Sequence, residues 1–410
     1  MSKHFDALET RSTDERKSAL ATRLPQQIAH AKANTAYFGE SLKGVDAAKV
    51  TSTGALAALP VVRKSDLIEL QKQQRPFGGL AASHWGKLGR VFSSPGPIYE
   101  PEGRCTDYWR TARALYAAGF RAGELVHNSF SYHMTPGAWI MEAGALALGC
   151  TVFPAGVGQT EQQVAAMADL QPNGYVGTPS FLRILLEKAD ELGVKLPSLT
   201  KALVSGEAFL PPVREALLAR GIAGYQAYAT AELGVIAYET GAREGLVIDE
   251  GVIVEIVRPG TGDPVAVGEV GEVVVTTFNT DYPLIRFGTG DLSAFLPGIS
   301  PCGRTNLRIR GWMGRADQTT KVKGMFVHPE QIAAVVKRHP EIARARLVVT
   351  NPDSNDVMTL RCEAVASGEL AAAIGETVRE VTKLRGVVEL VAANTLPNDG
   401  RVIADERKYD

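Results

Sequence analysis

Between residues 125 and 220 the chain alternates short apolar runs with amphipathic stretches, and this alternation constrains the fold more than any other feature. The apolar runs are 125–130, 150–154, 174–177 and 201–205, and the stretches with helical spacing are 138–148, 159–170, 181–192 and 212–220. Short apolar runs that alternate with helices are typical of strands covered on both faces. The pattern therefore predicts the α/β class, with helices on both faces of a sheet.

In such a sheet, ligands bind beyond the carboxyl ends of the strands. Several loops follow predicted strands and can converge on one cleft; these are 93–101, 131–137, 177–180, 205–207 and 228–234. The first of them lies in a stretch rich in Pro, Gly and Ser, 91–101, which we predict to be an irregular loop. Residues 104–118 are predicted to be helical.

The character of the chain changes after Gly234. Runs of β-forming residues separated by glycines follow, at 247–257, 265–270 and 272–277, and they predict a barrel-like or antiparallel subdomain. From Asp317 onward the pattern is strand, strand, helix, strand, helix, strand. We therefore predict a large N-terminal domain of α/β sheets over 1–316, with a β-rich subdomain at about 245–311, and a small C-terminal α+β domain over 317–410.

Composition excludes some classes of partner. The chain has 410 residues, with 44 Lys and Arg against 45 Asp and Glu. It therefore has no excess of basic residues of the kind that would indicate nucleic acid binding. Apolar runs stay shorter than the roughly 18 residues that a membrane span requires, and the first residues are polar rather than typical of a signal peptide. The four cysteines are scattered, as in a reducing compartment. We therefore expect a cytoplasmic protein.

The stretch 281–291 suggests a ligand-binding turn. Gly288 and Gly290 allow the backbone to turn tightly, and Asp291 stands at the end of that turn. A carboxylate can accept two hydrogen bonds at once, which suits the vicinal hydroxyls of a ribose. A plain loop with an acidic tip explains this stretch, taken alone, equally well.

The order of motifs along the chain indicates which protein family this chain resembles. The motifs are LPVVRKSD at 59–66, GQTEQQ at 158–163, TPS at 178–180, SGE at 205–207, YQAYATAELG at 225–234, PLIRFGTGD at 283–291, MGRAD at 313–317 and FVHPEQI at 326–332. Each is weak alone, because short motifs carry a high false-positive risk. Together, over about 370 residues, they resemble the phenylacetate–CoA ligase family of the adenylate-forming (acyl-CoA synthetase) superfamily.

The resemblance implies a two-step reaction. ATP and an aromatic, phenylacetate-like carboxylic acid give an acyl-adenylate and pyrophosphate, and CoA then displaces AMP to give a thioester. Adenylation is needed because a carboxylate is a poor electrophile without a good leaving group. The resemblance further implies Mg²⁺, a C-terminal domain that moves between the half-reactions, and a possible homodimer.

The resemblance also implies roles for individual residues. Glu232 would hold the magnesium, and Arg401 would stand in for a catalytic lysine. Residues expected to bind the nucleotide or CoA are Ser93, Ser94, Gly96, Ser205, Gly206, Glu207, Tyr228, Ala229, Asp291, Arg315 and Lys323. Tyr132, His133 and Ala231 would contact the acid, and Asp317 would be the hinge. Trp139 and Phe181 can line the same pocket or belong to the core.

Three departures from the family pattern matter, and two of them, the altered phosphate loop and Arg401, concern the same step, which is triphosphate handling and adenylation. The phosphate loop of the family is rich in Ser, Thr and Gly and ends in Lys-Pro, whereas here Pro95 and Pro97 remove N–H donors and Glu100 stands roughly at the place of the lysine. Ala231 replaces a hydroxyl residue, and Arg401 replaces the C-terminal lysine. Arginine keeps the charge but not the compact ammonium geometry.

Two hypotheses therefore stay open at the level of the sequence. The first is an ATP-dependent acid–CoA ligase. The second is a non-adenylating relative that binds a nucleotide or acyl-CoA. The cysteines that can hold a structural zinc in the family are reduced to Cys302, with Ser300 beside it, and because a tetrahedral site needs four ligands we expect no structural zinc.

Overall fold

The computed structural model describes residues 3–316, 318, 320–322, 325–352 and 356–407. The chain divides into two compact units. Unit 1 comprises 1–254, 275–289 and 296–312, and unit 2 comprises 255–274, 290–295 and 313–410. The predicted boundary at 316/317 stays a prediction, because Asp317 lies outside the described residues.

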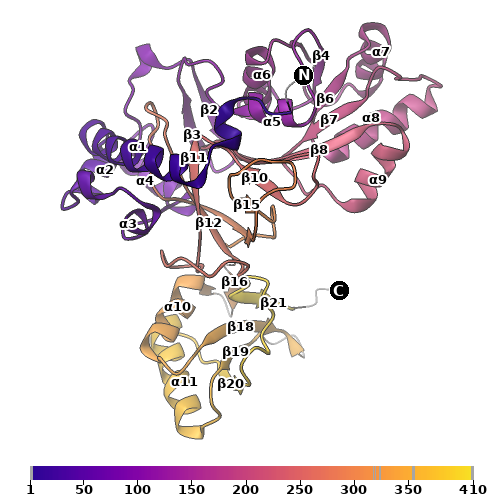
Figure 1. The fold of residues 1–410 in the computed structure, drawn as a ribbon. Coiled ribbons are helices and arrows are strands. Elements are labelled where there is room, and N and C mark those ends of the chain that lie inside the picture. The colour runs from indigo at the N-terminus through magenta and orange to yellow at the C-terminus, as the bar shows by residue number, and fades with distance from the viewer. Residues whose placement is uncertain (1–2, 317, 319, 323–324, 353–355, 408–410) are drawn as a thin grey trace. The chain divides into compact units, whose positions relative to one another are not determined.

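A nine-stranded sheet forms the centre of unit 1 (Figure 1). Its order is β14-β15-β10-β9-β8-β7-β6-β4-β5. The strands are β4 (Leu125–Asn128), β5 (Thr151–Pro154), β6 (Gly174–Gly177), β7 (Lys201–Val204), β8 (Ala223–Thr230), β9 (Gly234–Glu239), β10 (Leu246–Ile248), β14 (Phe295–Leu296) and β15 (Arg308–Ile309). Strands β5, β4, β6, β7 and β8 run parallel, and β9 and β10 continue the sheet antiparallel.

Helices cover both faces of the parallel part, which confirms the predicted α/β class. Helices α5 (Thr111–Ala117) and α6 (Gly137–Ala147) share one core cluster with Val176 and Leu203. Helices α7 (Thr160–Leu170), α8 (Pro179–Glu191) and α9 (Pro211–Ala219) share another with Tyr175 and Ala202. Neighbouring residues of β6 and β7 thus enter opposite cores, as the pleat requires.

The N-terminal segment packs as helices, and the longest is well capped. Its helices are α1 (Thr13–Asn34), α2 (Ala36–Ser41), α3 (Thr53–Ala57) and α4 (Leu67–Gln73). Ser12 and Glu15 form a reciprocal capping box at the start of α1. Leu24, Ile28 and Ala31 form its buried stripe, with the spacing that the sequence predicts.

Two smaller sheets complete the β structure before residue 316. One has the order β1-β13-β12-β11, with β1 (Val62–Arg63), β11 (Val252–Val257), β12 (Gly271–Thr277) and β13 (Phe287–Ser293). The other is the hairpin of β2 (Arg90–Ser94) and β3 (Ile98–Glu102). The prediction of an irregular loop at 91–101 is therefore wrong, and the strand predicted at 265–270 is absent from this described stretch. The helix predicted at 104–118 begins only at Thr111.

The C-terminal part of unit 2 is an α+β fold. Its sheet has the order β20-β19-β18-β21, with β18 (Arg344–Thr350), β19 (Val357–Glu363), β20 (Val387–Val391) and β21 (Ile403–Asp405). Helices α10 (Pro329–Arg338) and α11 (Gly368–Thr382) share its core, which includes Ile332, Leu347, Leu360 and Ile374. A further hairpin joins β16 (Thr320–Val322) and β17 (Met325–Val327). Within the described part of the chain, no helix is both long and apolar enough to cross a membrane.

Candidate active site

The parallel strands bring three of the predicted loops to one edge of the sheet. Because β4, β6 and β7 run parallel, the segments that follow them leave at the same edge. After β7, Ser205 Oγ donates a hydrogen bond to the carbonyl of Ala227 at 2.8 Å, and Gly206 takes a positive φ of 84°. The Glu207 carboxylate accepts the backbone N–H of Ser180 at 2.7 Å, so it joins the loops after β6 and β7.

The strand β8 carries the next set of predicted residues. Its register shifts between Tyr228 and Ala229, and a positive-φ glycine, Gly234, opens the antiparallel return strand. The hydroxyl of Tyr228 lies 3.1 Å from Thr289 Oγ1. This shift re-aims the side chains at the end of β8, where Ala231 and Glu232 follow.

The hairpin β2–β3 holds the residues predicted to form the phosphate loop. The backbone N–H of Ser93 already donates to the carbonyl of Met134 at 2.9 Å. Ser94 is 6% exposed, and its hydroxyl donates to Oε1 of Glu100, which stands opposite Phe92 in the ladder. A side chain at Gly96 would meet Ile98 Cγ1 at 2.9 Å, so only glycine fits this tip.

The buried side chains of Glu100 and Glu232 in unit 1 influence each other electrostatically. The Glu100 side chain is fully buried, and that burial raises its pKa to about 8, with the negative charge of Glu232 adding to the rise. Nζ of Lys64 lies 2.7 Å from Oε1 of Glu232. Neither Glu232 oxygen accepts a well-directed hydrogen bond from the described residues, and the same holds for Oε2 of Glu100 and the hydroxyl of Tyr282.

The residues predicted to contact the acid follow β4. The Tyr132 hydroxyl donates to Glu142 at 2.6 Å and accepts from Asn128 at 2.9 Å. The rings of Tyr132 and Trp139 pack edge to face, with centroids 5.1 Å apart. His133 is exposed.

Unit 2 holds the predicted ribose and lysine-replacement residues. Asp291 lies within β13 rather than at the end of a turn, so that prediction is wrong about the local backbone. Its Oδ1 pairs with Nη1 of Arg315 at 2.9 Å, and Gly290 is packed closely against the same guanidinium. Arg315 and Arg401 line one cavity of about 260 Å³ in unit 2. Asp317 and Lys323 lie outside the described residues.

Reasoning from the sequence missed Lys64 and Tyr282. Lys64 belongs to the 59–66 motif and Tyr282 immediately precedes the 283–291 motif, so proximity to a motif was the only available signal. Among the described residues there is no group of three or more His, Cys, Asp and Glu side chains that could hold a metal ion. Cys302 Sγ lies 3.0 Å from Ser300 Oγ, and the absence of zinc stays a prediction.

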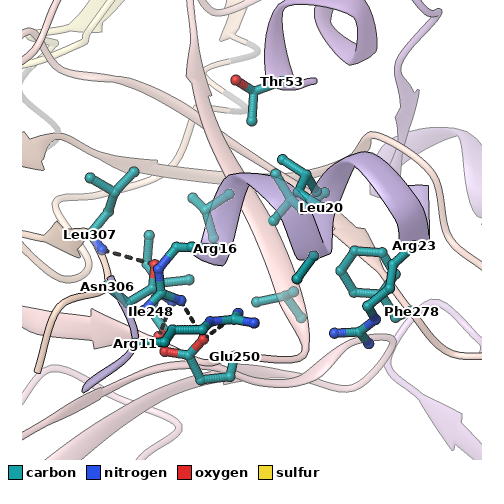
Figure 2. A pocket seen from close by; sticks show the side chains of 14 residues that line it. Arg11, Arg16, Leu20, Arg23, Thr53, Ile248, Glu250, Phe278, Asn306 and Leu307 are labelled. Atoms are coloured by element: carbon teal, nitrogen blue, oxygen red, sulfur yellow. Dashed lines mark hydrogen bonds and ion pairs between the residues drawn. The ribbon is translucent and has the colours of Figure 1, made fainter. Parts of the chain in front are cut away.

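A second cavity, of about 130 Å³, lies apart from these loops (Figure 2). It is lined by α1 and by residues around β10 and β11. Arg11 and Arg16 both pair with Glu250, while the guanidinium of Arg23 lies 4.0 Å from the centre of the Phe278 ring. Its polar groups are engaged with one another, so this cavity does not belong to the candidate active site.

Comparisons with known proteins place this geometry in a class. Residues 109–280 match the family model described as "AMP-binding enzyme". A 2-hydroxyisobutyryl-CoA ligase, solved in an open conformation with 2-HIB-AMP and CoA, matches with a TM-score of 0.73 and 27% identity, over 97% of this chain and 92% of that chain. The fold and the arrangement of loops are thus those of an AMP-forming acid–CoA ligase.

Sequence relatives give the family. A phenylacetate-coenzyme A ligase of Aromatoleum evansii is 31% identical over 88% of this chain and 84% of that protein. Another from Thermus thermophilus is 30% identical over 87% and 83%, respectively. The chain belongs to the phenylacetate–CoA ligase family of the adenylate-forming superfamily, as the order of its motifs predicts.

Proposed function

We propose that the chain uses ATP to activate an aromatic, phenylacetate-like carboxylic acid and then transfers the acyl group to CoA. The observation that carries this proposal is the identity of 31% to a phenylacetate-coenzyme A ligase over most of both chains. The structural relative with 27% identity is a ligase in complex with an acyl-AMP and CoA. The relatives named here are ligases, and they give the non-adenylating alternative no support.

The proposed nucleotide-binding residues are those that the family resemblance implies. The nucleotide would contact Ser93, Ser94, Gly96, the segment 205–207, Tyr228 and Ala229. The carboxylate of Asp291 would accept hydrogen bonds from the ribose hydroxyls, and Arg315, 2.9 Å away, would hold that carboxylate in position. Lys323 is proposed to contact CoA, and Asp317 to act as the hinge.

Glu232 fits a divalent cation. Its side chain is buried, Oε1 pairs with Nζ of Lys64 at 2.7 Å, and Oε2 accepts no hydrogen bond from the described residues, so Oε2 is the oxygen that a bound cation would contact. A bound Mg²⁺ would neutralise charge on the phosphate oxygens during adenylation. Arg401 would add a fixed positive charge where the acid carboxylate attacks.

The acid is proposed to be aromatic because of the residues beyond β4. The edge-to-face pair of Tyr132 and Trp139 offers an aromatic wall, and an aryl ring packs well against such a surface. His133 and Ala231 are proposed to contact the same acid. A small aliphatic hydroxy acid is the natural competitor, since it is named for the structural relative.

Pyrophosphate release tests the proposal. The protein is incubated with ATP, Mg²⁺ and CoA together with phenylacetate, benzoate or 2-hydroxyisobutyrate, and both pyrophosphate and acyl-CoA are measured. We expect acid-dependent release that is fastest with an aromatic acid. Fastest release with 2-hydroxyisobutyrate would overturn the aromatic assignment, and folded protein that binds AMP but releases no pyrophosphate with any acid would overturn the ligase assignment.

A variant pair tests the role of Arg401. Arg401→Ala is expected to lower the rate of pyrophosphate release by about a hundredfold, the usual order for loss of one electrostatic contact to the reacting group. Arg385→Ala, which removes another exposed arginine of unit 2, is the matched control and is expected to stay within about twofold of the wild type. Equal rates for the two variants would show that Arg401 does not act in adenylation.

Cytoplasmic location and a homodimer complete the proposal. Light scattering after size-exclusion chromatography measures the oligomeric state, and a mass of 43.8 kDa in solution, which is that of one chain, would contradict the homodimer.

A further inference from the structure

The loop that carries Arg401, residues 397–403, is tied to a distant segment of unit 2 by the side chain of Gln318. This glutamine is half-buried and stands one residue after Asp317, the proposed hinge. Its amide Nε2 donates to the backbone carbonyl of Gly400 at 3.1 Å, and its Oε1 accepts the backbone N–H of Ile403 at 2.8 Å. One side-chain amide thus holds the backbone on both sides of Arg401.

The same amide also contacts the chain just before the proposed hinge. Nε2 of Gln318 donates to the backbone carbonyl of Arg315 at 3.1 Å. A primary amide has two N–H donors and one carbonyl oxygen, so these three hydrogen bonds use both donors and the acceptor. Gln318 lines the cavity of about 260 Å³ that Arg315 and Arg401 share. The glutamine therefore links the two arginines of this cavity through their backbones.

Other contacts hold the first half of the 397–403 loop. The carboxylate of Asp399 accepts the backbone N–H of Arg401 at 3.0 Å and pairs with the guanidinium of Arg346. A Cβ at Gly400 would meet Val270 Cγ1 at 2.6 Å, so the backbone of the loop is closely packed there. The loop is anchored along its backbone, whereas the residue Arg401 is exposed and its guanidinium can meet a ligand.

A fixed loop matters because of the chemistry proposed for Arg401. A positive charge stabilises a developing negative charge best when it is held in place before the reaction. Arginine already has a flexible side chain, and a mobile backbone would add further freedom that must be lost. A displacement of about 1 Å can cost a large factor in rate. Contacts that fix the backbone on both sides of such a residue therefore bear directly on the reaction.

We propose that Gln318 is a positioning residue for Arg401. Its amide ties the 397–403 loop to the carbonyl of Arg315, so that the two arginines are held in one arrangement around their cavity. In this role Gln318 acts through Arg401 and does not itself touch the reacting atoms. The inference rests on the proposed function for the role of Arg401 in adenylation, whereas the anchoring of the loop can be measured without turnover.

Hydrogen–deuterium exchange of the full chain, followed by mass spectrometry, tests the anchoring. Gln318→Met keeps the length of the side chain and removes the amide, and the backbone N–H groups of 397–403 are expected to exchange at least about fivefold faster. Gln318→Glu keeps an acceptor but loses both donors, and it should change the exchange in the same direction.

Gln331→Met is the matched control. Gln331 also joins two segments of unit 2, because it donates to the carbonyl of Val381 at 3.0 Å and accepts the backbone N–H of His328 at 3.0 Å. Neither partner belongs to the 397–403 loop. The control variant therefore removes a similar glutamine bridge, and the exchange of 397–403 is expected to stay within about twofold of the wild type.

Kinetics test whether the anchoring serves Arg401. Gln318→Met should lower kcat for pyrophosphate release about tenfold and leave the KM for ATP within about twofold, because it displaces a charge that acts in the transition state. In the Arg401→Ala background the same change should have less than a twofold effect, because residues that act through one another are not additive. Gln331→Met should stay within about twofold of its parent in either background.

The outcomes separate this inference from the proposed function. Faster exchange of 397–403 in both Gln318 variants, with unchanged exchange in Gln331→Met, supports the anchoring even if no acid supports pyrophosphate release. Unchanged exchange in the Gln318 variants overturns it even if the protein is an active ligase. An equal loss of rate with and without Arg401 overturns the positioning role, because Gln318 would then act independently of that arginine.

Discussion

Unit 1 contains two groups of buried acidic residues that are treated in opposite ways. Near the N-terminus, Glu9 accepts hydrogen bonds from the Tyr238 hydroxyl at 2.6 Å, Arg304 Nε at 2.8 Å and the backbone N–H of Phe5 at 2.7 Å. Glu250 likewise pairs with two arginines, Arg11 and Arg16, as Figure 2 shows. By contrast, Glu100 has the hydroxyl of Ser94 and Glu232 has the ammonium of Lys64 as its one partner, and Oε2 of each accepts no hydrogen bond from the described residues.

The difference separates buried carboxyl groups that are saturated with donors from buried carboxyl groups that have few. A carboxylate that is saturated with donors gains nothing from a ligand, and removing one of its partners mainly costs stability. A carboxylate that lacks donors costs stability as it stands, and a ligand that satisfies it can bind there. Such unsatisfied buried groups are expected at functional sites more than elsewhere.

The largest effect is expected at the saturated group. Arg304→Met should lower the free energy of unfolding by about 3–5 kcal/mol, because it removes the closer of two guanidinium groups at the buried carboxylate of Glu9, at 2.8 Å, and leaves only Arg113 at 3.9 Å. Urea denaturation measures the change. Arg183→Met, which breaks an exposed pair with Glu187, is the control and should cost less than about 1 kcal/mol. Similar losses in the two variants would remove the distinction between these ion pairs.

Asp107 is intermediate between the well-paired and the poorly paired carboxyl groups, and its contribution to stability depends on pH. Its carboxylate accepts the backbone N–H groups of Thr111 at 2.8 Å and Ala112 at 3.1 Å, yet burial raises its pKa from 3.8 to about 6. Because the pKa is higher in the folded state, the stabilisation is complete below pH 3.8 and is lost as the pH rises through 6. The loss is at most about 3 kcal/mol for a shift of this size.

Asp107→Asn keeps an acceptor for the backbone and removes the titration. The difference in unfolding free energy between wild type and variant, measured by urea denaturation at steps between pH 4 and pH 7.5, is expected to move in favour of the variant as the pH rises. A difference that does not change with pH would mean that Asp107 titrates at its ordinary pKa.

The smallest effect tests how well Glu9 is satisfied. Tyr238→Phe removes one donor, but Arg304 and the backbone N–H of Phe5 remain. The variant should lose about 1 kcal/mol of stability, the usual net contribution of one hydrogen bond. Thermal and urea unfolding measure it. A loss above about 3 kcal/mol would mean that Glu9 depends on a single donor and resembles Glu100 more than this comparison assumes.

The sequence predicts the parallel sheet well because strand and helix periods are both strong between residues 125 and 220. Loops after β4, β6 and β7 consequently lie at one edge, as expected. The prediction failed where proline and glycine suggested a loop at 91–101. The structure pairs this stretch as an isolated two-stranded hairpin, in which Pro95 and Pro97 occupy the tip and Pro101 a strand position.

Pairings between distant segments could not be predicted. Nothing in the sequence around Lys64 indicates that it meets Glu232, and Glu100 was identified only as a departure from the family pattern. The ion pair of Lys64 and Glu232 joins residues that lie far apart in the sequence. The roles of the predicted site residues stay predictions, whereas the family and the α/β class are confirmed by the relatives and the fold.

The partners of Glu9 have a consequence for how the chain is made. Glu9 and Arg304 are 295 positions apart, so the N-terminal segment is synthesised long before the closer of the two arginines that pair with Glu9. At a ribosomal speed of about 5–20 residues per second, that delay is on the order of 15–60 s. During this time the first segment of unit 1 can already contact Arg113 and Tyr116, but a nascent chain stalled before Arg304 would leave Glu9 with fewer donors and hold this segment less firmly.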